Sequence, residues 1–289
     1  MSEIAPVLSR PPSVTTEPRL TRHILIGTVF VLIAILLFAP LIAVFSQALS
    51  KGWAVALESL TAPDARAAIR LTLIISAIAV PLNAVFGIAA AWAITKFDFR
   101  GKAFLITLID LPFSVSPVVA GLALVLLFGA NSTLGAWLIA HDVKIVFAVP
   151  GILLATLFVT FPFVARELIP VMMEQGRAEE EAALTLGASG WRCFFTVTLP
   201  NIRWALLYGV LLCNARAMGE FGAVAVISGK IRGETTTMPI MIEMLYNEYL
   251  SVAAFTLASV LALLALVTLL LKSLLEWRYA DLLAATRRH

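Results

Sequence analysis

Charge is the scarcest property of this 289-residue sequence: 13% of its residues are charged, whereas 61% are hydrophobic. An ordinary soluble domain carries about 25% charged residues. A soluble core of this length could not bury so much apolar surface, so a water-soluble globular protein is excluded. Intrinsic disorder and nucleic-acid binding are excluded as well, because both require charge. The formal net charge of +3 is too small to attract a polyanion.

Residues that carry chemistry are also few. The two cysteines, Cys193 and Cys213, form no C-x-x-C pair and have no histidine cluster near them. A disulfide framework or a zinc site is therefore not expected. The hydrophobic runs hold no His pair, no Ser/His set and no H-E-x-x-H motif, which disfavours an intramembrane enzyme. The sequence also lacks G-x-x-x-x-G-K-[ST], the loop that holds nucleotide phosphates.

Long charge-free runs predict six membrane-spanning helices, because about 20 apolar residues cross a bilayer core of about 30 Å. The predicted spans are Ile24–Phe45, Leu71–Thr95, Ala103–Phe128, Ile145–Ala165, Trp204–Ile227 and Leu250–Leu271. The first has no small-residue cleavage site after it and is interpreted as an uncleaved anchor. The third carries Asp110, Pro112 and Pro117, so we expect it to be kinked or broken near its inner end. Leu134–Ile139 is too short to span and is predicted to be a turn of helix at a surface.

The basic residues predict the orientation of these spans. Six spans put both termini on one side, and fourteen of the 21 Lys and Arg residues fall on that side, against six on the other. The positive-inside rule therefore places both termini in the cytoplasm. The predicted organisation is a flexible cytoplasmic tail over 1–22, a six-span domain over 23–277 and a cytoplasmic C-terminal tail over 278–289. No internal repeat is clear, which weighs weakly against secondary transporters built from inverted repeats.

The segment between the fourth and fifth spans is acidic on an otherwise basic face, with four glutamates and two arginines over 173–192. Arg177–Leu186 consists of good helix formers, and Gly187 follows where a helix C-cap favours a left-handed residue. The apolar pattern that resumes at Trp191 predicts a second short helix before Pro200. Composition alone is equally compatible with a solvated charged helix. The more specific interpretation is an element that docks on a basic groove of another protein.

The segment over 174–200 resembles the E-A-A-x3-G-x9-I-x-L-P signature of ABC importer permeases. The matching residues are Glu181, Ala182, Ala183, Gly187, Leu199 and Pro200, with Val197 in place of the isoleucine. The resemblance implies an all-α transmembrane fold, the six-helix type I importer permease with a cytoplasmic coupling helix. It also implies that this segment sits in a cleft of an ATP-binding subunit. Glu181 would pair with a basic residue there, and Gly187 would make the turn.

Other segments resemble the oxyanion branch of that family, namely 114–121 and 214–223. The segments 199–210 and 228–235 are more similar to its sulfate/thiosulfate type, W-type subunit, with permeases for molybdate or another oxyanion as the alternative. The resemblance implies import from a periplasmic sulfate-binding protein across the bacterial inner membrane. The implied complex contains two ATPase subunits, which bind ATP-Mg, and a homologous T-type permease, all surrounded by membrane lipid. No cofactor is expected in this chain itself.

Polar residues inside the spans are candidates for a translocation path. Arg216 lies about 18 Å along its span from Trp204, and Glu220 follows four residues later on the same face. An arginine near the bilayer centre costs about 2.5–3.5 kcal/mol, so it needs a partner or a cavity. The pair either fixes the fifth span against its neighbours or lines the path, where Arg216 would attract the anion and Glu220 would ease its release. Ser114 and Ser116 either donate to an oxyanion or satisfy backbone broken at proline.

Two further predictions concern the ends of the spans. Asp110 is expected to cap or break the third span together with the nearby prolines. The outer loop with Lys230, Arg232 and Thr235–Thr237 is compatible with contact to a binding protein and, equally, with a solvated loop. The main alternative function, an ion-driven secondary transporter, is disfavoured by the docking-type segment.

Overall fold

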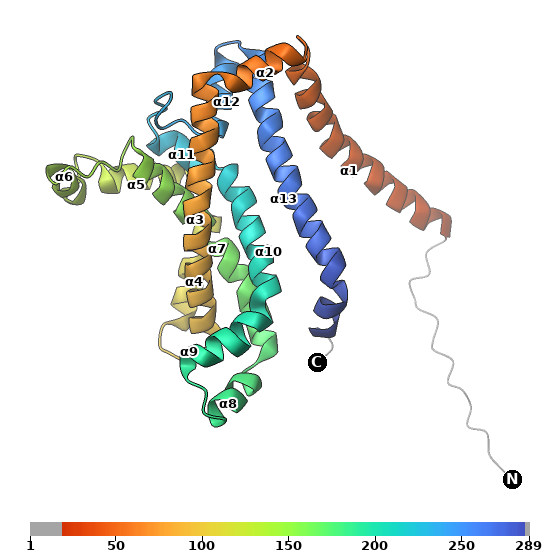
Figure 1. Ribbon diagram of the computed structural model, residues 1–289, viewed down its shortest axis with the longest axis vertical. Helices are drawn as coiled ribbons and strands as arrows, with labels where there is room; N and C mark the ends of the chain where they lie inside the picture. The colour runs from red at the N-terminus through yellow and green to blue at the C-terminus, as the bar shows by residue number, and fades with distance from the viewer. Residues whose placement is uncertain (1–18, 287–289) are drawn as a thin grey trace.

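The computed structural model describes residues 19–286, and all regular elements in that range are helical. In chain order they are α1 (Arg19–Ala48), α2 (Trp53–Thr61), α3 (Pro63–Lys96), α4 (Lys102–Ser114), α5 (Pro117–Phe128), α6 (Thr133–Ala140), α7 (Val149–Gln175), α8 (Ala178–Thr185), α9 (Gly190–Cys193), the π-helix η1 (Phe194–Thr198), α10 (Leu199–Met218), α11 (Gly222–Ile227), α12 (Met238–Asn247) and α13 (Ser251–Thr286). The long helices run between two ends of the molecule, with α2 and α12 at one end and α8 at the other (Figure 1).

Five helical runs in the described range are long and apolar enough to cross a membrane: α1, α3, α7, the run Gly190–Met218 and α13. The third predicted span is different, because α4 and α5 are bent by 108° and form one span only if the pair crosses as a unit. A break is confirmed, but it lies midway in the predicted span rather than near its inner end. Pro112 is accommodated inside α4. The bend falls before Pro117, where Ser116 adopts the extended backbone that a following proline favours.

The fifth predicted span is wrong as a single helix. α10 ends at Met218 and α11 begins at Gly222, so the chain breaks inside the predicted span. At its other end α10 is continuous with η1 and α9, and the second short helix expected before Pro200 is therefore not separate from it. The wider π-helical turn lies just before Pro200. It accommodates the proline, which lacks the N–H needed to continue the α-helical hydrogen-bond pattern.

The core lies where α3, α7 and α10 pack together. Fully buried aliphatic side chains come from all three helices, among them Ile94, Leu168 and Ile202. Polar groups also join the helices, since Asn83 Nδ2 donates to Thr160 Oγ1 at 2.7 Å. Hydrogen bonds of this kind between spans hold membrane helices together, where apolar packing against lipid gives little preference for a partner helix.

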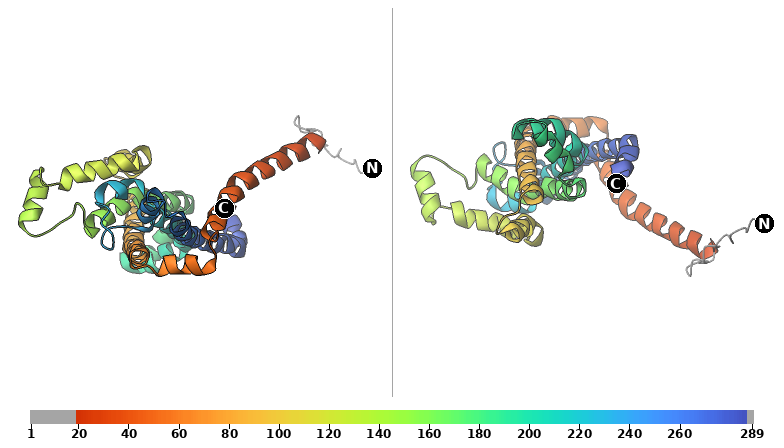
Figure 2. Two further views of the ribbon diagram at one scale, coloured as in Figure 1. Left: turned by 90° about the horizontal axis from the view of Figure 1, so that it is seen from above. Right: turned by 90° about the horizontal axis from the view of Figure 1, so that it is seen from below.

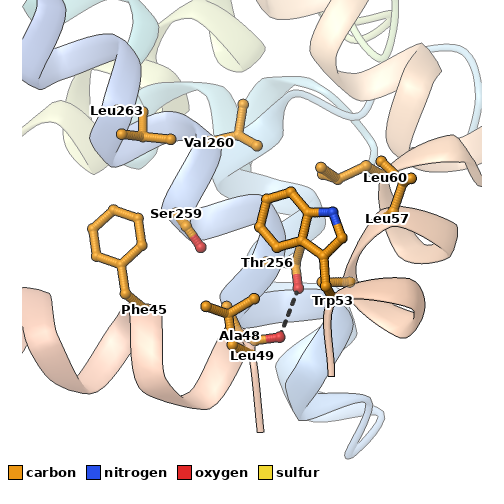
Figure 3. Close-up of a pocket in the computed structure, with 11 residues that line it drawn as sticks. Phe45, Ala48, Leu49, Trp53, Leu57, Leu60, Thr256, Ser259, Val260 and Leu263 are labelled. Atoms are coloured by element: carbon orange, nitrogen blue, oxygen red, sulfur yellow. Dashed lines mark hydrogen bonds between the residues drawn. The ribbon is translucent and has the colours of Figure 1, made fainter. Parts of the chain in front are cut away.

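Helix α1 stands apart from this core, as Figures 1 and 2 show. None of its most apolar 18-residue window is buried. Near its C-terminal end α1 contacts α13, where Thr256 Oγ1 donates to Ala48 O at 3.5 Å. Residues of α1, α2 and α13 line an open groove of about 480 Å³, with Phe45, Trp53 and Leu263 around it (Figure 3). Thr256 in the groove donates to Val252 O at 2.7 Å. The groove therefore presents an almost entirely apolar surface.

The end of α13 lies toward the end of the molecule that carries α8, whereas the start of α1 lies off to one side, about midway between the two ends (Figure 1). Residues 1–18 of the predicted N-terminal tail lie outside the described residues, and α1 begins at Arg19, within that tail. α13 continues to Thr286, past position 278 where the C-terminal tail was predicted to begin. The added stretch is rich in Leu and Ala, which are good helix formers.

Helix α5 packs closely on α11, and Gly121 makes this approach possible. A Cβ at this position would lie 2.6 Å from the backbone oxygen of Ala223 and 3.0 Å from its Cα. Gly121→Ala is expected to lower stability by about 1–3 kcal/mol, because backbone atoms must move to admit the methyl group. The measurement is the thermal midpoint of the detergent-solubilised protein. Gly27→Ala in α1 is the control, since a Cβ there meets nothing within 4 Å; equal midpoints for the two variants would contradict the expectation.

Candidate functional site

The predicted docking segment folds as expected in its first half. Helix α8 occupies 178–185, inside the predicted 177–186. It ends in a Schellman motif, in which Ala188 N donates to Ala183 O and Gly187 N to Leu184 O, both at 3.0 Å. Gly187 has φ +85°, so the predicted left-handed position is confirmed. A second left-handed glycine, Gly176, precedes the helix with φ +66°.

The signature residues lie in two parts of the structure. Glu181 and Ala182 are exposed on α8, and no hydrogen bond or ion pair of the Glu181 carboxylate is found among residues 19–286. Leu186 is 89% exposed at the tip of the segment. Leu199 and Pro200 belong to the first turn of α10, where Leu199 is half-buried against the core and Pro200 is exposed. The exposed group on α8 and at the tip combines a free carboxylate with apolar side chains, a surface suited to a protein partner.

A cluster that the sequence did not predict lies behind this surface. Lys96 Nζ lies 2.9 Å from Glu180 Oε2, and Thr198 Oγ1 donates to Glu180 Oε1 at 2.6 Å. The Lys96 and Glu180 side chains are only 7% and 16% exposed. In the sequence, Lys96 is one of the fourteen basic residues on the predicted cytoplasmic side, and Glu180 is one of the four glutamates over 173–192. Three glutamates in one helical turn point in different directions, so composition gives no sign of which one turns inward.

The break between α4 and α5 lies against the break between α10 and α11. A Cβ at Gly222, in the first turn of α11, would lie 2.9 Å from Pro117 Cβ, in the first turn of α5. The predicted path residues are thereby divided between two adjacent bends, Ser114 and Ser116 at the first, and Arg216 and Glu220 at the second. Broken helices within a membrane are tolerated where the freed backbone is buried in protein or lines a cavity.

Arg216 and Glu220 form an ion pair across the second bend. Arg216 Nη1 lies 2.6 Å from Glu220 Oε2, and the side chains are 34% and 1% exposed. The other carboxylate oxygen accepts from Ala223 N at 3.0 Å, in the first turn of α11. Glu220 therefore joins the end of α10 to the start of α11. Both partners of the pair belong to the same predicted span and lie on either side of its bend.

The other predicted polar residues are placed as follows. Ser114 and Ser116 are exposed, and Ser116 precedes α5 without a capping hydrogen bond from its side chain. The interpretation that they satisfy broken backbone thus finds no support within 19–286. Asp110 does not cap a helix: its carboxylate accepts from Arg166 Nε of α7 at 2.7 Å. The Arg166 guanidinium also lies over the Phe113 ring, 5.8 Å from its centroid.

The loop predicted to lie on the outer side is tied to this chain by ion pairs, although its residues 231–234 are exposed. Lys230 Nζ lies 2.7 Å from Glu243 Oε2 on α12. Arg232 contacts Asp64 at the start of α3 at 3.3 Å and also pairs with Glu248 after α12. Thr235, Thr236 and Thr237 are buried. Both cations therefore have partners within the chain.

Residues 83–281 match the family described as "Binding-protein-dependent transport system inner membrane component". The sulfate transport system permease protein CysW of Escherichia coli (strain K12) is 56% identical over 254 residues, covering 88% of this chain and 87% of the relative. The CysT permease protein of the same strain is 39% identical over 254 residues, covering 88% and 92%.

Among solved structures, one chain of a bacterial alginate ABC transporter, in complex with an alginate pentasaccharide-bound periplasmic protein, superposes with a TM-score of 0.72. It is 17% identical, and the match covers 91% of this chain and 95% of that one, which establishes a shared fold. The family match spans more than half of the chain and the relatives match over most of their length. The chain therefore belongs to the family of inner-membrane components of binding-protein-dependent transport systems, the ABC importer permeases.

Proposed function

We propose that this chain is the permease subunit through which an ATP-driven importer moves sulfate or thiosulfate from a periplasmic binding protein into the cytoplasm. The proposed substrate rests on the 56% identity to the CysW sulfate permease protein over 88% of the chain. A permease for molybdate or another oxyanion is the alternative, since no residue of the described chain distinguishes these anions by itself.

The proposed orientation places α8 and both chain ends in the cytoplasm of a bacterial cell. The end of α13 and α8 lie toward the same end of the molecule (Figure 1), which supports a shared side for these two elements. Fourteen of the 21 Lys and Arg residues lie in the tails and loops that are predicted to share the side of α8. Such an excess marks the cytoplasmic face. The exposed α1 and the groove beside it would contact membrane lipid or a neighbouring subunit.

The proposed partners follow from this orientation. Two ATPase subunits would supply ATP-Mg chemistry, and one would receive the exposed tip around Glu181 and Leu186. The second permease would be of the T type, because CysT of the same bacterium as CysW is also a relative, at 39% identity. The chain itself would transport and carry out no hydrolysis.

The proposed mechanism is a shift between two populations of conformers. Sulfate carries two negative charges and is strongly hydrated, so a permanently open basic path would leak anions. ATP binding would draw the docked segments together and favour the outward-facing state, and release of products would favour the inward-facing one, because a ligand shifts an equilibrium only by binding the two states differently. The partly exposed Arg216, with Ser114 and Ser116 at the adjacent bend, would contact the anion on its way.

The test is transport in liposomes by the complete complex of both permeases and the ATPase, supplied with a sulfate-binding protein. Sulfate-loaded binding protein is expected to raise ATP hydrolysis and to deliver labelled sulfate into the liposomes. The same protein loaded with molybdate serves as the comparison. Stimulation and uptake with molybdate but not with sulfate or thiosulfate would replace the proposed substrate by the alternative.

A further inference from the structure

Helix α8 has an unusual mode of attachment to the rest of the chain. It contains eight residues, and none of them is buried. Left-handed glycines, Gly176 and Gly187, stand on both sides of it, and glycine permits a wide range of backbone angles. Apolar packing therefore contributes little to its orientation, and the hinges on either side do not fix it.

Polar contacts supply the attachment instead. The Glu180 clamp, as we name Glu180, Lys96 and Thr198, connects α8 to the last residue of α3 and to the last residue of η1. Lys96 Nζ also donates to Gly176 O at 2.5 Å, so the same ammonium holds the hinge before α8. A second contact joins Asn201 in the first turn of α10 to the carboxylate of Glu179.

The clamp ends on elements that extend into the membrane core. Lys96 is the terminal residue of α3, and Thr198 leads directly into α10. Trp92 of α3 packs against Phe194 of η1 with ring centroids 5.0 Å apart, so the inner ends of the two helices are already joined by apolar contact. The clamp connects this pair of helices to α8, and the contact of Asn201 with Glu179 adds to that connection on the side of α10.

We propose that the Glu180 clamp is the link through which movement of α8 reaches the membrane helices, with Glu180 and Lys96 as positioning residues. The inference rests on the proposed function, in which an ATPase subunit binds the exposed side of α8 at Glu181. Neighbouring glutamates then have opposite tasks: Glu181 faces the partner, and Glu180 faces the chain. Loss of the clamp leaves the docking surface in place but lets α8 turn on its glycine hinges without moving α3 and α10.

The test measures ATP hydrolysed per sulfate imported by the complete complex in liposomes. In Glu180→Gln and Lys96→Met this ratio is expected to rise about tenfold, within the range by which connecting residues change coupling, while the ATPase still co-purifies. Lys96→Arg keeps the charge and is expected to keep a ratio near that of the wild type. Lys102→Met is the matched control, because Lys102 pairs at 3.6 Å with Asp98 in the loop before α4 rather than with a residue of α8.

The double variant Lys96→Met/Glu180→Gln shows whether the pair transmits movement of α8 or only stabilises the fold. It leaves no unpaired buried charge, so folding is expected to recover, whereas the ratio is expected to stay high. A double variant that returns to the wild-type ratio, or single variants that never leave it, would overturn the proposal. A wild-type complex without sulfate-stimulated hydrolysis would refute the proposed function instead, and would remove the premise of the clamp with it.

Discussion

Replacing Glu181 with alanine is expected to prevent the ATPase subunit from co-purifying with the permease. The carboxylate is exposed and has no partner within the described chain, so the variant should fold as the wild type does. Truncating one member of a charge pair that becomes buried in an interface costs about 2–5 kcal/mol, which corresponds to about 30-fold or more in affinity. The measurement is ATPase recovered with the purified permease, together with the thermal midpoint of the permease alone.

Glu174→Ala is the matched control for that variant, since Glu174 is exposed but belongs to the last turn of α7 rather than to α8. Gly187→Pro should act in the same direction as Glu181→Ala, because proline cannot adopt φ +85°. Gly190→Ala, where a Cβ meets nothing within 4 Å, should bind normally. Intact ATPase binding in both Glu181→Ala and Gly187→Pro would refute the docking role of α8.

The second large effect is expected at the ion pair of Arg216 and Glu220. Removing one member of a buried pair costs about 3–5 kcal/mol, because it leaves an uncompensated charge. Arg216→Ala should show this cost in full, since it leaves the Glu220 carboxylate, whose side chain is 1% exposed, without its cationic partner. Arg216→Ala should lower both assembly and sulfate uptake. The measurements are recovery of the assembled complex and uptake of labelled sulfate per complex.

The double variant Arg216→Met/Glu220→Met distinguishes the two roles of the pair. Apolar residues of similar volume can replace a buried ion pair without loss of stability, so assembly should be largely restored. If Arg216 contacts the anion, uptake per complex stays low even though the complex assembles. Normal uptake by this variant, or by an assembled Arg216→Ala complex, would exclude Arg216 from the path.

The sequence was sufficient to predict the elements whose cause is local. Long apolar runs predicted the spans, good helix formers followed by glycine predicted α8 and its left-handed end, and a proline pair predicted a break in the third span. The position of that break was harder to predict, because Pro112 and Pro117 are both helix breakers and only the tertiary fold accommodates the former inside α4. The break after Met218 has no proline, and depends on packing of α11 against α5.

The contacts of the site depend on residues far apart in the chain, which is why they were not predicted. Lys96 and Glu180 are separated by the whole of α4 to α7, and Asp110 finds Arg166 on another helix. Arg216 and Glu220 were predicted as a pair because four residues separate them on one helical face. The sequence could not show that the chain breaks between them, and this break makes Glu220 a joint rather than a point on a continuous helix.

The unbroken passage from α9 through η1 into α10 makes Gly190–Met218 a lever of unequal arms. If the contact of Phe194 with Trp92 serves as its fulcrum, the arm back to Gly190 measures about 6 Å and the arm to Met218 about 36 Å, at 1.5 Å per residue. A displacement of about 1 Å at the short arm would then become about 6 Å at the far end, where Arg216 and Glu220 close the bend. Under the proposed function, a small movement of the docked segment would thus be amplified about sixfold before it reaches this ion pair.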